Sequence, residues 1–103
     1  MTNADEILGE LFEVIEDRKK NLPPDSYTTS LFTHNRGENA VLEKLGEEMT
    51  ELILAAKDDD SEEIAHEGAD VIYHLLVLLA QHDMSLEDLT NELTVRRGSL
   101  KES

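Results

Sequence analysis

Four carboxylates in two pairs have the spacing that metal chemistry requires. Glu48 and Glu51 lie three positions apart, and Glu67 and Asp70 repeat that spacing further along the chain. Residues three apart are neighbours on one face of a helix. Ligation by carboxylate oxygens, completed by water and phosphate oxygens, suits Mg²⁺ or Mn²⁺ better than a soft metal. From chemistry alone the alternative stays open that these side chains are solvated positions on two amphipathic helices, because the chain has 24 Asp and Glu residues.

The elements that carry these pairs are predicted as two long helices, over residues 38–57 and 62–82. Their apolar residues recur at helical spacing, at Val41, Leu45, Met49, Leu52 and Ala56 in the first and at Ile64, Val71, Ile72, Leu75, Leu78 and Leu79 in the second. The short connection Asp58–Asp60 favours an antiparallel hairpin. Packing of such a hairpin brings the two carboxylate pairs together, and a divalent cation would relieve their repulsion.

The remaining segments predict an all-α, four-helix bundle-like subunit in a single domain, residues 1–103. A first helix is expected over 4–20 and a fourth over 86–97, with a frayed tail over 98–103. Pro23–Pro24 stop the first helix, and the connection over residues 21–37 shows no helical periodicity. A connection of this length favours a binding loop or lid.

The helix over 62–82 has a second apolar face, formed by Ala69, Tyr73, Val77 and Ala80. This helix is therefore hydrophobic nearly all round. A chain of 103 residues in four helices cannot cover both faces itself. The sequence thus predicts a homodimer that buries the Tyr73 and Val77 face.

The composition excludes several classes of partner. With nine Lys and Arg against 24 Asp and Glu, the net charge of −15 opposes nucleic-acid phosphates and anionic membranes. The longest apolar run, Val71–Ala80, is about half the length of a membrane span. The acidic N-terminal residues do not resemble a signal peptide, and there is no cysteine. We therefore expect a cytoplasmic protein without nucleic-acid or membrane partners.

Read as strings, EEMTE at Glu47–Glu51 and EGAD at Glu67–Asp70 resemble the signature of the all-α nucleoside triphosphate pyrophosphatase (MazG-like) superfamily. The segments LFEVIEDRKKNLPPDSYTTSL, EKLGEE, ELILAAKDDD and ADVIYHLLVLLA resemble the phosphoribosyl-ATP pyrophosphatase family, over about residues 8–97. That resemblance implies Mg²⁺-dependent hydrolysis of the α–β phosphoanhydride of phosphoribosyl-ATP. The products would be phosphoribosyl-AMP and pyrophosphate, in the second step of histidine biosynthesis.

The resemblance also implies roles for individual residues. The metal ligands would be Glu48, Glu51, Glu67 and Asp70, and Glu47 would be an accessory ligand or would orient the attacking water. Two departures from the family pattern are Gly68, where Ala is more usual, and the longer or more polar stretch FTHNRGENA. The second departure leaves the contacts of the 21–37 loop open.

Further substrate contacts are predicted from position. Lys44 and Lys57 lie on the Glu48 flank of the 38–57 helix or at its end, and Ser26, Tyr27 and Thr28 lie in the loop. The alternatives are a solvated cation at a helix C-terminus for Lys57 and simple turn chemistry for the loop residues. His74 is expected to be a core histidine with satisfied hydrogen bonds or a neighbour of the metal ligands.

Two other functions remain as alternatives. A house-cleaning pyrophosphatase would use the same metal site on noncanonical nucleoside triphosphates, although the SYT and EDRK runs argue against it. A non-enzymatic acidic helical protein would use its carboxylates only for solvation. That last alternative predicts neither pyrophosphate release nor specific stabilisation by Mg²⁺.

The acidity predicts salt-dependent folding. We expect the thermal unfolding midpoint to rise between about 0.1 M and about 2 M KCl, because the Debye length falls from about 10 Å at 0.1 M to about 3 Å at 1 M. Circular dichroism across a KCl series measures this midpoint. A flat or falling midpoint would contradict salt adaptation and leave the enzyme prediction untouched.

Overall fold

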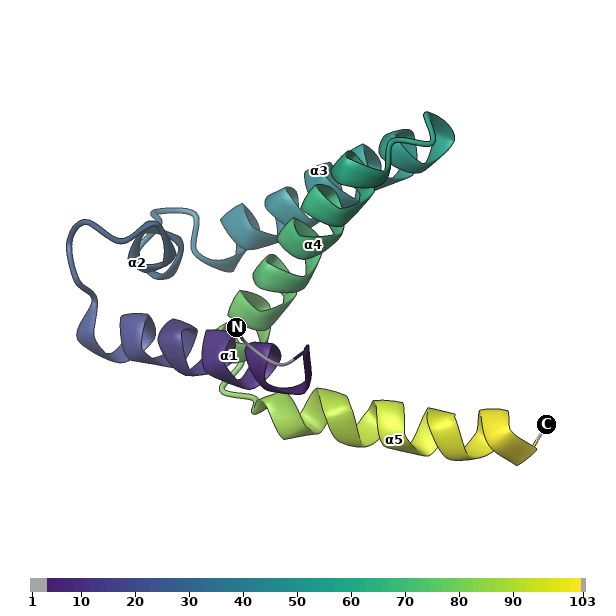
Figure 1. Ribbon diagram of the computed structural model, residues 1–103. Helices are drawn as coiled ribbons and strands as arrows, with labels where there is room; N and C mark the ends of the chain where they lie inside the picture. Colours follow the sequence, from purple (N-terminus) through teal and green to yellow (C-terminus); the bar gives the residue numbers. More distant parts are fainter. Residues whose placement is uncertain (1–3, 103) are drawn as a thin grey trace.

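The computed structural model describes residues 4–102, and these residues form five helices without a strand. The helices are α1 (Ala4–Asn21), α2 (Tyr27–Phe32), α3 (Glu38–Lys57), α4 (Ser61–Gln81) and α5 (Leu86–Glu102) (Figure 1). The all-α prediction is confirmed, and the two long central helices begin and end within one residue of their predicted bounds. In the described part of the chain, no helix is both long and apolar enough to cross a membrane.

Helices α3 and α4 form the antiparallel hairpin that the short acidic connection predicts, and they pack side by side (Figure 1). The turn places Asp59 in the left-handed region, with φ of 54°. Asp60 then caps α4, because its side chain accepts a hydrogen bond of 3.2 Å from the Glu63 backbone N–H. The cap satisfies one of the free N–H groups of the first turn. Local sequence therefore fixes both ends of the hairpin turn.

The long loop predicted over 21–37 is wrong in part, because it contains the short helix α2 (Tyr27–Phe32). Ser26 caps this helix by accepting a hydrogen bond from the Thr29 backbone N–H at 3.2 Å. Thr29 and Leu31 are buried. Six residues give less than two turns, which is too short for an apolar period to show in the sequence.

The predicted frayed tail over 98–103 is also wrong for the described residues, since α5 continues through Gly98 to Glu102. This helix leaves the others and extends alone, so the subunit resembles an open V and not a closed four-helix bundle (Figure 1). Leu93 and Val95 on it are 55% and 66% exposed. Gly98 predicts the end of the helix, but a glycine can also lie within a helix, and the sequence alone does not distinguish the two cases.

The core lies where α1, α2 and the first turns of α3 meet the C-terminal half of α4. Its buried side chains are Ile15, Leu31, Val41, Leu76, Val77, Leu79 and Ala80. At its edge the Lys19 ammonium donates 2.6 Å hydrogen bonds to the Ala80 carbonyl and to Asp83 Oδ1, which joins α1 to the end of α4. This ion pair also lowers the pKa of Asp83.

The predicted dimer face is wrong, because Val77 and Ala80 are 0% exposed within the subunit. Conversely, Met49 and Ile72, which were expected in the core, are each 45% exposed. The helical period correctly finds two apolar faces on α4. The helical period does not tell which of the two faces α1 and α2 cover. In the structure, α1 and α2 cover the Val77 face.

Candidate active site

Three of the predicted ligands meet between the two helices of the hairpin: Glu48 on α3, and Glu67 and Asp70 on α4. Glu67 is buried, and the other two are half-buried. The pKa of Glu48 is raised to about 7, first by a hydrogen bond with Glu67, then by burial and by the negative charge of Asp70. Below about pH 7, and without a cation, Glu48 therefore carries a proton between the two helices.

The donor set fits a divalent cation. Among the described residues Glu67 Oε2 is buried and has no hydrogen-bond partner. One ligand atom each from His66, Glu67 and Asp70 lies within 4.8 Å of the others. A buried carboxylate oxygen without a donor is costly, and a metal ion would supply the missing partner. Carboxylate oxygens favour Mg²⁺, and the imidazole of His66 is compatible with Mn²⁺.

His66 was not singled out from the sequence. It lies four residues before Asp70 on α4, and its Nε2 is 3.5 Å from Asp70 Oδ2. That i,i+4 spacing is the signal that could have identified it. Its side chain is 65% exposed, so it stands on the solvent side of the carboxylates.

The fourth predicted ligand, Glu51, lies outside this group. It is exposed on α3 and lines a hollow near the turn of the hairpin, together with Asp58, Asp60 and Glu63. Lys57 lies at the same end of α3, away from the cavity beside α2. The structure thus brings together three of the four carboxylates and leaves Glu51 and Lys57 towards the hairpin tip.

A cavity of about 310 Å³ opens between α2 and the first half of α3. Its walls are formed by Tyr27, Ser30, Leu31, His34, Arg36, Ala40, Glu43, Lys44 and Glu47. Three predicted site residues, Tyr27, Lys44 and Glu47, therefore share one cavity, and Lys44 Nζ is 3.8 Å from Glu47 Oε2. His34 and Arg36 were missed because a residue in an irregular segment has no helical period that places it. Glu43 lies on α3 and was missed because its partner, Arg36, could not be placed.

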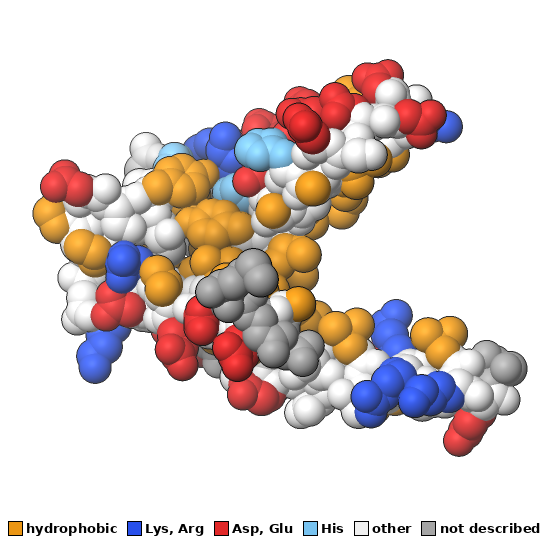
Figure 2. Space-filling view, in the orientation of Figure 1, with side chains coloured by type: hydrophobic (Ala, Val, Ile, Leu, Met, Phe, Trp, Pro, Cys, Tyr) orange, Lys and Arg blue, Asp and Glu red, His pale blue; other side chains and the backbone are white. Residues whose placement is uncertain are grey.

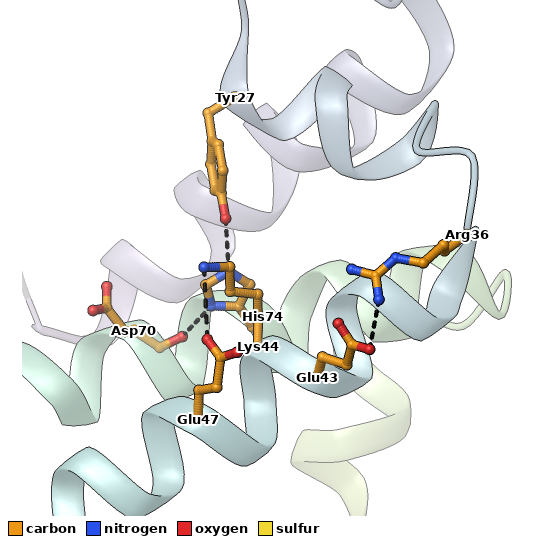
Figure 3. A network of polar contacts seen from close by, with 7 residues as sticks. All are labelled: Tyr27, Arg36, Glu43, Lys44, Glu47, Asp70 and His74. Atoms are coloured by element: carbon orange, nitrogen blue, oxygen red, sulfur yellow. Dashed lines mark hydrogen bonds and ion pairs between the residues drawn. The ribbon is translucent and has the colours of Figure 1, made fainter.

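Hydrogen bonds hold α2 against α4 beside the carboxylates (Figure 3). His74 is 4% exposed, and its Nδ1 donates to the Asp70 backbone carbonyl at 2.9 Å. Since a carbonyl only accepts, Nε2 is left as the acceptor for the Tyr27 hydroxyl at 3.3 Å. Thr28, a predicted substrate contact, instead bonds the hydroxyl of Tyr73. His74 is the core histidine with satisfied hydrogen bonds that the sequence predicts.

The model of the phosphoribosyl-ATP pyrophosphohydrolase family matches residues 8–97. The chain belongs to this family. Among its relatives, the phosphoribosyl-ATP pyrophosphatase of Haloarcula marismortui is 71% identical over 92 residues, which are 89% of this chain and 94% of the relative. That of Natronomonas pharaonis is 70% identical over 95 residues, or 92% and 94% of the two chains. That of Halobacterium salinarum is 63% identical over 91 residues, or 87% and 96%.

Membership of the phosphoribosyl-ATP pyrophosphohydrolase family confirms the resemblance predicted from the EEMTE and EGAD strings. It also confirms the predicted enzyme class, a hydrolase of histidine biosynthesis. Of the functions left open by the residues alone, the non-enzymatic acidic protein is disfavoured by this assignment.

The raised pKa of Glu48 predicts how stability depends on pH without Mg²⁺. In the folded protein the pKa of Glu48 is about 7, whereas the ordinary pKa of a Glu side chain is 4.5. Stability contributed by the proton is complete below pH 4.5 and is lost as the pH rises to about 7. Urea unfolding across this range should show a smaller loss for Glu48→Gln than for the parent.

Glu62→Gln is the matched control, because Glu62 is an exposed carboxylate in the first turn of α4, the other helix of the hairpin. It should keep the parent's dependence on pH. Mg²⁺ should reduce the parent's loss above pH 6 or so, because the cation stabilises the ionised carboxylates. Equal pH dependence in Glu48→Gln and the parent would contradict the shared proton.

Proposed function

We propose that this chain hydrolyses the α–β phosphoanhydride of phosphoribosyl-ATP, releasing phosphoribosyl-AMP and pyrophosphate with Mg²⁺. The observation that carries the proposal is the meeting of Glu48, Glu67 and Asp70 between α3 and α4, with Glu67 Oε2 buried and unpartnered among the described residues. A triphosphate needs its charge neutralised and a water molecule placed in line with the bond that breaks. The proposal assigns these two tasks to neighbouring groups of carboxylates.

When bound, Mg²⁺ would neutralise the phosphate oxygens of the reacting anhydride. Glu48, Glu67 and Asp70 hold it in this proposal, with Glu51 one turn along α3 from Glu48. Glu47 is 65% exposed at the cavity wall and is proposed to orient the attacking water and accept its proton. Lys44 would contact a phosphate oxygen. No side chain needs to act as a nucleophile, because the water oxygen forms the new bond to phosphorus while the anhydride bond breaks.

Pyrophosphate release tests the function directly. With Mg²⁺ the parent should release pyrophosphate from phosphoribosyl-ATP much faster than from ATP or dUTP. Asp70→Asn should lower turnover by about 100-fold or more, since even the outer partners of metal ligands contribute 10–100-fold. Circular dichroism should show unchanged helix content, because the substitution removes a charge from a repelling group.

Glu62→Gln again serves as the matched control and should keep parental turnover. Glu51→Gln tests the predicted ligand that the structure leaves apart. Substantial turnover of Glu51→Gln at saturating Mg²⁺ would remove Glu51 from the ligands, and equally fast release from dUTP by the parent would favour the house-cleaning alternative.

We further propose that the protein is a homodimer, with a different face from the one predicted. The exposed apolar side chains Leu42, Met49 and Ile53 on α3, and Ile64 and Ile72 on α4, follow the hairpin. Figure 2 shows hydrophobic side chains along the side of the hairpin that faces the open gap of the V. Contiguous exposed apolar surface of this kind marks interaction sites. Gly46 and Gly68 lie on the same face without contacts at their Cβ positions, which leaves room for close approach.

Ile53→Asp should convert the dimer to a monomer, because a charge on a buried interface is costly. Light scattering measures the mass. Asn35→Asp adds the same charge to an exposed residue between α2 and α3 and should leave the mass unchanged. A dimeric Ile53→Asp variant would place the interface elsewhere.

A further inference from the structure

The cavity between α2 and α3 has as many cations as carboxylates in its wall, Arg36 and Lys44 against Glu43 and Glu47, in a chain that is otherwise strongly acidic. Arg36 and Lys44, two of the nine Lys and Arg residues, line this one cavity, and His34 joins them. The chain as a whole has 24 Asp and Glu residues and a net charge of −15. A concave site where cations balance the carboxylates is less repulsive to an anion than the rest of this surface, and its Arg and Lys side chains are the groups that an anionic ligand would contact.

The donors of the cavity remain available to a ligand. The Arg36 ion pair with Glu43 runs through one guanidinium nitrogen, at 2.6 Å from Glu43 Oε1. His34 Nδ1 accepts a hydrogen bond of 3.1 Å from the Arg36 backbone N–H, so a neutral His34 carries its proton on Nε2 as a donor. Lys44 Nζ stands 3.8 Å from Glu47, beyond hydrogen-bond distance.

The cavity adjoins the carboxylate group without containing it. Its wall includes Glu47 but not Glu48, Glu67 or Asp70, which face each other between α3 and α4. Figure 3 shows the Tyr27 hydroxyl directed at His74 of α4, and the pairs Lys44–Glu47 and Arg36–Glu43 along α3. A molecule whose reacting phosphates lie at the carboxylates can therefore extend a second anionic group towards Arg36.

We propose that Arg36, with His34 and Lys44, binds the phosphate monoester on the ribosyl group of phosphoribosyl-ATP. This inference rests on the proposed function. The triphosphate of that substrate has a divalent cation to neutralise it, whereas the monoester has none and needs cationic side chains. Arginine offers a planar fork of donors that matches phosphate oxygens. At about 310 Å³ the cavity is at the lower end of ligand sites, which suits one end of the substrate and not the whole molecule.

Arg36→Ala is the decisive variant. It should raise KM for phosphoribosyl-ATP about 10-fold to 100-fold, the range expected for a charge-assisted hydrogen bond, and change kcat by less than about 2-fold. ATP has the triphosphate but lacks the ribosyl monoester, so its inhibition constant in the same Mg²⁺-containing assay should stay unchanged. Arg36→Lys keeps the charge but not the fork and should give an intermediate KM.

Arg96→Ala is the matched control, since it removes the same charge from an exposed ion pair with Glu92 on α5. It should leave both constants unchanged. An equal rise in KM and in the ATP inhibition constant for Arg36→Ala would assign Arg36 to the triphosphate and overturn the inference. An unchanged KM would also overturn it, while parental pyrophosphate release would still support the proposed function. Absence of pyrophosphate release by the parent would reject the function and this subsite together.

Discussion

The arrangement of the whole subunit depends on carboxylates packed between two helices. At an effective dielectric constant of 20, two charges about 5 Å apart repel by roughly 3 kcal/mol. The two halves of α4 have different roles. Leu76, Val77 and Ala80 in its C-terminal half belong to the core, whereas Glu67 and Asp70 lie in its N-terminal half. Apolar packing at one end holds together a pair of helices that repel at the other. Protonation of Glu48, or a bound cation, relieves that repulsion.

Helix α2 contacts both the core and the cavity beside α3. Leu31 is buried in the core, while Tyr27 reaches His74 and lines the cavity beside α3. His74 in turn donates to the backbone of Asp70. The same six-residue helix is thus fixed by the core and faces both the carboxylates and the cations. The longest connection predicted from the sequence proves to be a structured wall of the site.

The features that could be predicted from the sequence are those that depend on residues close together in the chain. The bounds of α3 and α4 and the meeting of Glu48 with Glu67 and Asp70 come from helical spacing and a short turn. The covered face of α4 could not be predicted, because the period treats its two apolar faces alike. Arg36 could not be placed either, since its position depends on how α2 returns to α3.

The net charge of −15 changes what the site must provide. A polyanionic substrate approaches this surface against repulsion, and a metal ion alone neutralises only the phosphates that it touches. At molar salt, screening over about 3 Å removes the long-range part of that repulsion. The relatives from Haloarcula, Halobacterium and Natronomonas share most of this sequence. In such a chain, substrate recognition would depend on contacts at close range, such as those proposed for Arg36 and Lys44.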